Sequence, residues 1–287
     1  MFGSTVDYWL LRPLTHRRYI ATEEELDARA DVEQPFDAAR AQRRLDKWNR
    51  RLDNRLPLRR DWRYLDVGCG QGDLTIAFAM AGCGYVCGID MIARNIARAK
   101  SSAAQLGLKG RVEFVCGDVH EWQTRDKFDV ILSHEALEHI LEPKAFLQRL
   151  ADVVADNGLA VLAFGPLFHS PLGDHMNAHF RVPIPWKGAL FSEQANLRLR
   201  AENFRPGDYP SRYQDMKGGL NLMRYSEFLR YVRETGWHVD TLRVNPQLRG
   251  YPPLYWMSCG LTRLPIVRDY FASSIYTILR RQPTSAS

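Results

Sequence analysis

The chain has 287 residues, 45% of them hydrophobic, which is enough to bury the core of one large or two small domains. No apolar run reaches the ~18 residues of a membrane-spanning helix, and the chain does not open on a basic-then-apolar leader pattern. Five scattered cysteines without zinc-site spacing favour reduced thiols and a cytoplasmic protein. The net charge of +6 permits an anionic partner without requiring one.

Residues 33–56 have the pattern of an amphipathic helix. Its apolar stripe would consist of Phe36, Ala39, Leu45, Trp48 and Leu52. The opposite face is basic and carries Arg40, Arg43, Arg44, Lys47, Arg50, Arg51 and Arg55. Such a face is ordinarily solvated, but it can also steer an anionic substrate such as a lipid-linked glycan, a membrane surface or RNA.

A glycine-rich turn at residues 64–74 is the strongest local signal in the chain. A short apolar run ends at Val67, glycines follow at 68, 70 and 72, and an apolar, alanine-rich segment continues to residue 81. This order predicts a strand, a tight turn and a helix, whose free N–H groups can meet a ligand. The spacing differs from the Gly-x-Gly-x-x-Gly of dinucleotide enzymes, which disfavours a pyrophosphate ligand. A glycine turn alone can also be purely structural.

Strand and helix patterns alternate from residue 62 to residue 165, which predicts an α/β fold with a parallel sheet covered on both faces. The predicted strands after the glycine turn are 86–90, 112–118, 128–132, 159–164, 237–244 and 274–280. The predicted helices are 92–106, 144–155 and 226–235. The second and third strands end in acids, and a doubly wound fold reads ribose hydroxyls with an acid at a strand tip.

Two segments interrupt this alternation. Residues 166–225 are rich in proline, glycine, aromatic residues and histidine, and residues 246–272 contain Tyr251, Tyr255, Trp256 and Met257. Both follow strand ends, where loops build substrate pockets in α/β proteins. Long irregular segments of this kind are often functional, so we expect 166–225 to form a lid.

The ordered set of glycine turn, acidic strand ends and later strands resembles the class I S-adenosylmethionine-dependent methyltransferases, nearest to the ubiquinone-biosynthesis O-methyltransferases. The resemblance implies a Rossmann-like doubly wound sheet of seven strands in the order 3-2-1-4-5-7-6 with an antiparallel last strand. It also implies an N-terminal helical cap (1–60), a methyltransferase domain (61–282) with the lid inserted at about 166–225, and a tail (283–287).

The resemblance further implies S-adenosylmethionine as the cofactor. Asp66 would reach the ligand's ammonium, directly or through water, and Asp90 would accept hydrogen bonds from the ribose hydroxyls. Asp118 and the backbone of Val119 would read the adenine. A single aspartate is more often a turn or cap residue, and only the three matching strand ends together favour a cofactor site.

The same resemblance assigns roles to the turn and to the residues after Asp90. Gly68, Gly70 and Gly72 would let the backbone pass close to the amino-acid and ribose parts of the cofactor. Met91 and Ile92 would flank the adenine as apolar walls.

A candidate chemical site follows the fourth strand. If residues 133–140 begin a helix, Glu135, Glu138 and His139 stand at i, i+3 and i+4 and share one face. Two carboxylates and an imidazole can hold a divalent ion or orient a base. The string is similar to one in the ubiquinone-biosynthesis O-methyltransferases. It is also similar to one in the small-RNA 3′-end 2′-O-methyltransferases, where those residues and a later histidine bind a metal.

The later histidine is expected to be His175, because Ser-Pro-x-Gly-x-His looks like a recurrent element of related bacterial enzymes. The metal set would then be Glu135, Glu138, His139 and His175, with Mg²⁺, Mn²⁺ or Zn²⁺ as candidates. Alternatively, the string is only a favourable charge arrangement at a helix start. Without a metal, His139 or His175 would be the general base, and Glu135 would face the substrate.

The leading hypothesis is therefore methyl transfer to a hydroxyl on a small molecule, a glycan or a lipid-linked intermediate. One alternative is an RNA 2′-O-methyltransferase, although no separate RNA-binding module is visible. Another is a non-catalytic binding protein with a methyltransferase fold. Residues 264–279 mix apolar side chains with arginine, so peripheral membrane contact is a further expectation, weaker than an ordinary last helix and strand.

Overall fold

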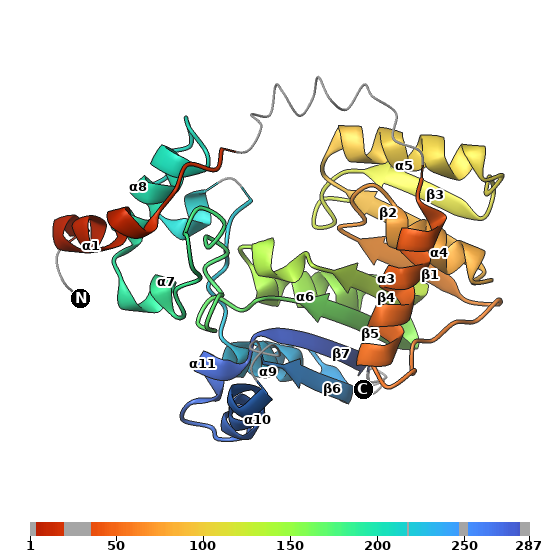
Figure 1. Ribbon diagram of the computed structural model, residues 1–287. Coiled ribbons are helices and arrows are strands. Elements are labelled where there is room, and N and C mark those ends of the chain that lie inside the picture. Colours follow the sequence, from red (N-terminus) through yellow and green to blue (C-terminus); the bar gives the residue numbers. More distant parts are fainter. Residues whose placement is uncertain (1–3, 20–35, 217, 247–251, 282–287) are drawn as a thin grey trace.

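The computed structural model describes residues 4–19, 36–216, 218–246 and 252–281, and its centre is one seven-stranded sheet (Figure 1). The strands are β1 Arg63–Val67, β2 Tyr85–Asp90, β3 Val112–Cys116, β4 Phe128–His134, β5 Val154–Phe164, β6 Trp237–Asn245 and β7 Ser274–Arg281. Their order is β3-β2-β1-β4-β5-β7-β6, and β7 is antiparallel to both of its neighbours. The predicted fold, strand order and antiparallel last strand are confirmed.

Two strands differ in length from their predictions. β5 begins at Val154 rather than residue 159, because Val154 pairs with Phe128 before an irregularity in the register. β3 ends at Cys116 rather than Asp118, because the Asp118 carboxylate accepts a bond from the backbone N–H of His120 and closes a turn.

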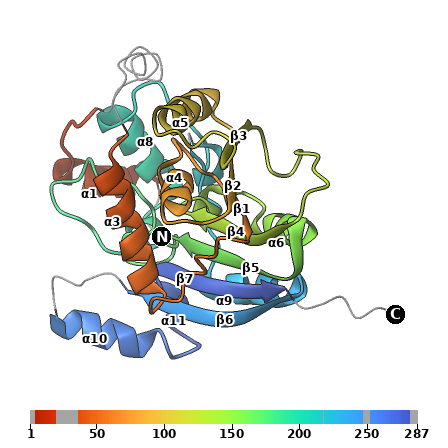
Figure 2. The same cartoon turned by 90° about the vertical axis from the view of Figure 1, so that its right-hand side faces the viewer.

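Helices cover both faces of the sheet (Figure 2). One face is covered by α3 Ala38–Arg51, α4 Asp73–Met80 and α5 Ala93–Gln105, and the other by α6 Pro143–Val153 and α9 Tyr225–Glu234. The central strands β1 and β4 are mainly apolar because they are buried on both sides, and they carry polar residues mainly toward their ends. The helix expected at 33–56 starts at Ala38, where the Asp37 side chain caps Arg40, and residues 33–35 lie outside the described ranges.

The N-terminal segment does not lie in one place. α1 Ser4–Leu11 and the 3-10 turn η1 Arg12–Leu14 lie against α8 Glu193–Asn203 of the lid, where Tyr8 hydrogen-bonds to Glu202. α3 lies instead on the sheet, where Leu45 and Trp48 join the core beside α4. We expected a single cap over residues 1–60, whereas its described parts belong to two separate regions.

The lid and the last insertion contain more helix than their irregular sequences indicate. The lid holds α7 Lys187–Leu190, α8 and the 3-10 turn η3 Tyr213–Asp215. The insertion between β6 and β7 holds α10 Pro252–Leu261 and α11 Arg268–Phe271, while residue 251 falls outside the described ranges. In the described ranges, no helix combines the length and apolarity needed to cross a bilayer.

Candidate active site

The glycine turn after β1 has the conformation that its sequence predicts. Gly68, Gly70 and Gly72 all have positive φ, of 74°, 54° and 80°. A Cβ on Gly68 would lie 2.8 Å from the Ala136 Cβ, and one on Gly72 would lie 2.8 Å from the Phe114 ring. A Cβ on Gly70 would meet nothing within 4 Å, so this part of the backbone faces open space. Two glycines are therefore required by packing, and the third leaves room for a ligand.

Asp90 ties the tip of β2 to this turn. One carboxylate oxygen accepts from the Gly70 N–H at 2.9 Å, and the other accepts from the Ile92 N–H at 2.9 Å. The side chain of Asn95 adds a longer contact of 3.4 Å. Each carboxylate oxygen has more than one acceptor site, so a carboxylate held in this way can still accept bonds from two ribose hydroxyls.

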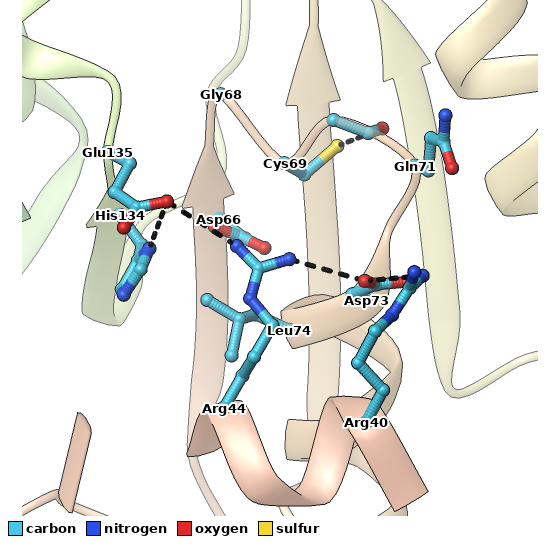
Figure 3. A pocket seen from close by; sticks show the side chains of 11 residues that line it. Arg40, Arg44, Asp66, Gly68, Cys69, Gln71, Asp73, Leu74, His134 and Glu135 are labelled. Atoms are coloured by element: carbon cyan, nitrogen blue, oxygen red, sulfur yellow. Dashed lines mark hydrogen bonds and ion pairs between the residues drawn. The ribbon is translucent and has the colours of Figure 1, made fainter. Parts of the chain in front are cut away.

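A cavity of about 380 Å³ lies between α3, the glycine turn and the end of β4 (Figure 3). It is lined by Arg40, Arg44, Asp66, Gly68, Cys69, Gly70, Gln71, Asp73, Leu74, His134 and Glu135. It thus brings together four of the expected site residues, one of them Glu135. Asp90, Met91, Asp118, Val119, His139 and His175 are not among the residues that line it.

Arg40 and Arg44 reach into this cavity from α3, one helical turn apart. Their guanidinium groups lie 3.1 and 3.2 Å from the Asp73 carboxylate, and Arg44 also lies 3.8 Å from Glu135. Sequence reasoning assigned both arginines only to a basic helix face. Their i, i+4 spacing on a helix expected to cover the cofactor was the signal that could have placed them here. Guanidinium groups suit a carboxylate such as that of the cofactor's amino-acid part.

Asp66 lies at the floor of the cavity and is buried. Its carboxylate accepts a 2.6 Å hydrogen bond from the Thr75 hydroxyl. Burial raises the pKa of Asp66 to about 6, above its ordinary value. A cation bound next to this carboxyl would favour its charged form, so the position suits the ammonium that the resemblance assigns to it.

The adenine side is more open. Met91 is 69% exposed and Ile92 is 46% exposed, so both apolar side chains are available to cover a flat ring. The side chain of Val119 is buried in the core, and its carbonyl accepts from Arg149, which leaves its backbone N–H as the expected adenine contact. The site fits the chemistry of S-adenosylmethionine, because it combines a lining of basic and acidic residues, an open turn and exposed apolar side chains.

The residues of the Glu-x-x-Glu-His string do not share one helix face, and that expectation is corrected. Glu135 has a φ of 56°, and only the short 3-10 turn η2 Leu137–His139 follows it. A left-handed residue interrupts an α-helix, so the i, i+4 geometry is not formed. Glu135 is directed to Arg44 and to His134, whereas the Glu138 carboxylate accepts from the Gly165 N–H and is buried.

His139 and His175 do come together. Their ring centroids are 5.6 Å apart in an edge-to-face arrangement. His139 Nδ1 lies 2.6 and 2.9 Å from the carbonyl oxygens of Gly218 and Gly219, and His175 Nε2 lies 2.8 Å from that of Pro166. Because a carbonyl oxygen only accepts, these nitrogens carry the protons, and Nε2 of His139 and Nδ1 of His175 are the acceptors. Burial lowers the pKa of His175, which favours its neutral form.

The expected metal set is thus spread over two places, with Glu135 at the glycine-turn cavity and the histidines where η2 contacts the lid. Across the described ranges, no three His, Cys, Asp or Glu residues converge as a metal ion requires. Glu138 directly precedes His139 in the sequence. Burial raises the pKa of the Glu138 carboxyl group to about 7, which favours its uncharged form.

His134 was missed as a site residue. It ends β4 and lines the cavity, and its ring lies 5.1 Å from the Trp48 ring of α3. Burial lowers the pKa of His134 to about 4, so the imidazole is neutral at pH 7. Its place directly before Glu135, at the tip of a central strand, was the only available sequence signal.

The fold is that of a Rossmann-like domain, and comparisons with known proteins refine this class. Residues 58–176 match a family model described as "Methyltransferase domain". A stretch of 101 residues is 41% identical to the ubiquinone biosynthesis O-methyltransferase of Rhodopseudomonas palustris (strain HaA2), over 35% of this chain and 39% of that protein. The corresponding protein of Bradyrhizobium sp. (strain ORS 278) is 38% identical over the same length.

Solved structures show the same fold at low sequence identity. An S-adenosylmethionine-dependent methyltransferase from Mesorhizobium loti superimposes with a TM-score of 0.53 at 17% identity, over 80% of this chain and 95% of that one. The [4+2]-cyclase SpnF superimposes with a TM-score of 0.54 at 18% identity, over 98% and 95% of the two chains.

The similarity to methyltransferases is thus shown for residues 58–176, which form the matched domain. The chain spans about 39% of the length of the curated relatives that it matches. A cyclase on the same fold also shows that the fold alone does not set the reaction.

Proposed function

We propose that this protein transfers a methyl group from S-adenosylmethionine to a hydroxyl of a small-molecule, glycan or lipid-linked acceptor. The proposal rests on the 41% identity to an O-methyltransferase over 101 residues, in a chain whose glycine turn is hydrogen-bonded to Asp90. A cytoplasmic location is part of the proposal, and the five unpaired cysteines support it.

In this proposal, Asp90 holds the ribose, Asp118 and the Val119 backbone hold the adenine, and Arg44 with Asp66 holds the amino-acid part. When bound, the cofactor supplies an electrophilic methyl group on its sulfonium. The chain's own contribution is to orient the acceptor oxygen and to take its proton.

The proton acceptor in this proposal is Nε2 of His139 or Nδ1 of His175. Each ring has its other nitrogen held by a backbone carbonyl, which sets the tautomer and the ring orientation. The imidazole would take the hydroxyl proton as the acceptor oxygen bonds to the methyl carbon, while the methyl–sulfur bond breaks and leaves S-adenosylhomocysteine. Glu135 would lie on the acceptor's path at the mouth of the cavity.

An RNA substrate has less support. Four arginines of the basic helix face are engaged within the domain itself: Arg40 and Arg44 by Asp73, Arg51 by Asn245 and Arg55 by Thr241. A helix whose cations already have partners is a weaker phosphate-binding surface.

The test is release of S-adenosylhomocysteine from S-adenosylmethionine during incubation with phenols, reducing sugars, a polyprenyl-linked sugar or single-stranded RNA. We expect turnover with one of the hydroxyl acceptors other than RNA, and a fall of roughly a hundredfold or more in His139→Ala with cofactor affinity unchanged. Full activity in this variant would exclude His139 as the base, and full activity in His175→Ala as well would contradict the histidine base.

The same assay separates the histidine base from the expected metal set. Unchanged turnover after treatment with a chelator fits the histidine base. Loss that Mg²⁺ restores, and that Glu138→Ala reproduces, would favour the metal set instead.

A further inference from the structure

Helix α10 turns an apolar side to solvent. Its outward positions are Pro253, Trp256, Met257 and Gly260, which follow the i, i+3, i+4, i+7 spacing of one helix face, whereas Ser258 is buried. Trp256 is 71% exposed and Met257 52%. A surface helix ordinarily carries polar residues on its solvent-exposed side, whereas α10 carries apolar residues there.

The loop after α10 extends this surface. Leu264 and Ile266 are exposed there, and Ile266 reaches 90%. Single exposed apolar residues are common, but adjacent ones on a helix and its following loop form the kind of contiguous patch that marks an interaction site.

Helix α1 has the same reversed pattern at the other end of the chain. Val6, Trp9, Leu10 and Pro13 are exposed at i, i+3, i+4 and i+7. The opposite side of α1 is buried against the lid helix α8. Two helices far apart in sequence therefore each present a tryptophan and aliphatic side chains outward.

The two helices are joined through the lid. The Asp7 carboxylate of α1 accepts from the Ser192 N–H just after α7, at 2.7 Å. At the start of α7, the Trp186 indole donates to the carbonyl of Tyr270 in α11, at 2.9 Å. Figure 1 shows α1, α7, α11 and α10 following one another down the left side of the molecule. We call the outward side chains of α1, α10 and the loop after α10 the apolar face.

The charges of these segments are positive. Arg12, Arg17, Arg18 and Arg263 are exposed on residues 4–19 and 252–271. The two acids in these ranges, Asp7 and Asp269, accept hydrogen bonds from Ser192 and Ser226. A second copy of the chain would bring the same cations against each other in a two-fold contact, which disfavours self-association. An anionic lipid surface complements both the cations and the apolar side chains.

We propose that the apolar face inserts into the interfacial region of an anionic bilayer, with Trp9 and Trp256 at headgroup depth. Tryptophan is enriched at this depth, and helices with an apolar face and basic neighbours lie in the plane of the interface. Because α11 joins α10 to the lid, the bilayer would lie beside the lid side of the protein. The binding requires neither cofactor nor acceptor, so it stands apart from the proposed reaction.

The test is co-sedimentation of the full chain with vesicles of phosphatidylglycerol and phosphatidylcholine, compared with phosphatidylcholine alone. We expect tighter binding to the anionic vesicles. Ile266→Asp should weaken it by roughly tenfold or more, because an isoleucine that leaves water contributes about that factor. Arg263→Gln should weaken binding to anionic vesicles roughly fivefold and leave binding to neutral ones unchanged.

Leu10→Ser and Leu106→Ser form a matched pair. Both remove the same exposed side chain, but Leu106 follows α5 on the opposite side of the molecule (Figure 1). We expect Leu10→Ser alone to weaken binding, with the thermal melting of both variants unchanged. Equal effects of the pair, or no sedimentation of the wild-type chain, would overturn the proposal. A wild-type dimer that Ile266→Asp dissociates, without any vesicle binding, would instead identify the face as a contact between copies.

Discussion

The cofactor side and the lid side of this protein are held together by different interactions. The cofactor side, β1–β4 with α3–α5, has an apolar core in which Val130 and Leu132 are fully buried, and its polar contacts gather at the strand tips. The lid side, residues 166–225 with α1, buries charges instead. Lys187 is bonded to Asp174 in its interior, and Arg200 lies 2.6 Å from Asp208.

The difference bears on how each side tolerates change. Apolar burial is non-directional, so the cofactor side depends on the sum of many contacts. A buried ion pair depends on both partners, since removal of one leaves an uncompensated charge. We therefore expect that substitution of a single buried charged residue will damage the lid and leave the cofactor site intact.

The largest effect is expected for Lys187→Met, which leaves Asp174 buried without its cation. The lid should lose about 3–5 kcal/mol of stability, measured as faster cleavage at residues 166–225 in limited proteolysis and a lower melting temperature. Affinity for S-adenosylhomocysteine should stay within about twofold, because the cofactor side does not contact this pair. Lys144→Met is the matched control, because its ion pair with Glu234 is exposed and screened by solvent, so its loss should hardly change the stability. Equal losses of stability in the two variants would contradict the claim that the lid depends on its buried ion pair.

Asp90→Ala should have the reverse effect, because it damages the cofactor side and leaves the lid intact. Two hydrogen bonds from the ribose to a charged group would be lost, so affinity for S-adenosylhomocysteine should fall roughly a hundredfold in calorimetric titration. The lid should keep its resistance to proteolysis. Asp126→Ala removes an exposed acid that pairs with Arg63, and it should leave the affinity unchanged. Unchanged affinity in Asp90→Ala itself would remove Asp90 from the site.

His179 makes the stability of the lid depend on pH. The ring is fully buried, neither nitrogen has a hydrogen-bond partner among the described residues, and burial lowers its pKa to about 4. The unfolded chain binds a proton below its ordinary pKa of about 6.5 and the folded lid does not, so stability is complete above that pH and falls toward pH 4. His179→Phe should remove this loss and add about 1–3 kcal/mol at pH 5, with little change at pH 7.5. Thermal melts at both pH values measure this change in stability. An equal change in melting temperature at both pH values would indicate an effect of packing and not of titration.

The smallest effect is expected where α3 meets the glycine turn. Arg44→Ala should reduce affinity for S-adenosylhomocysteine roughly fivefold, because a partly exposed ion pair contributes about 1 kcal/mol or less. Arg43→Ala, on the same helix but directed to Asp37, should have no effect on binding. A similar response of both variants would mean that general charge, and not the cavity, attracts the ligand.

Sequence patterns were sufficient for the sheet and for the cofactor turn. The alternation of strands and helices predicts the parallel sheet, and the family resemblance implies its strand order. The left-handed glycines follow from a turn that other residues rarely enter. The Glu-x-x-Glu-His string is a case in which such a pattern predicts the wrong local structure. Spacing predicts one helix face, but the backbone at Glu135 turns left-handed where the end of β4 packs beside Gly68. That turn depends on contacts from outside the string.

The sequence by itself determined the fold class and the glycine turn at which we place the cofactor, because periodic burial and glycine geometry are local properties of the chain. Only the tertiary structure decided what surrounds that place. It brought Arg44 from α3 to Asp73, set His139 beside His175 where η2 contacts the lid, and joined α1 to α11 through α7. These contacts link residues from about 30 to more than 180 positions apart in the chain. No local pattern carries such pairings, because they depend on how separately folded surfaces meet.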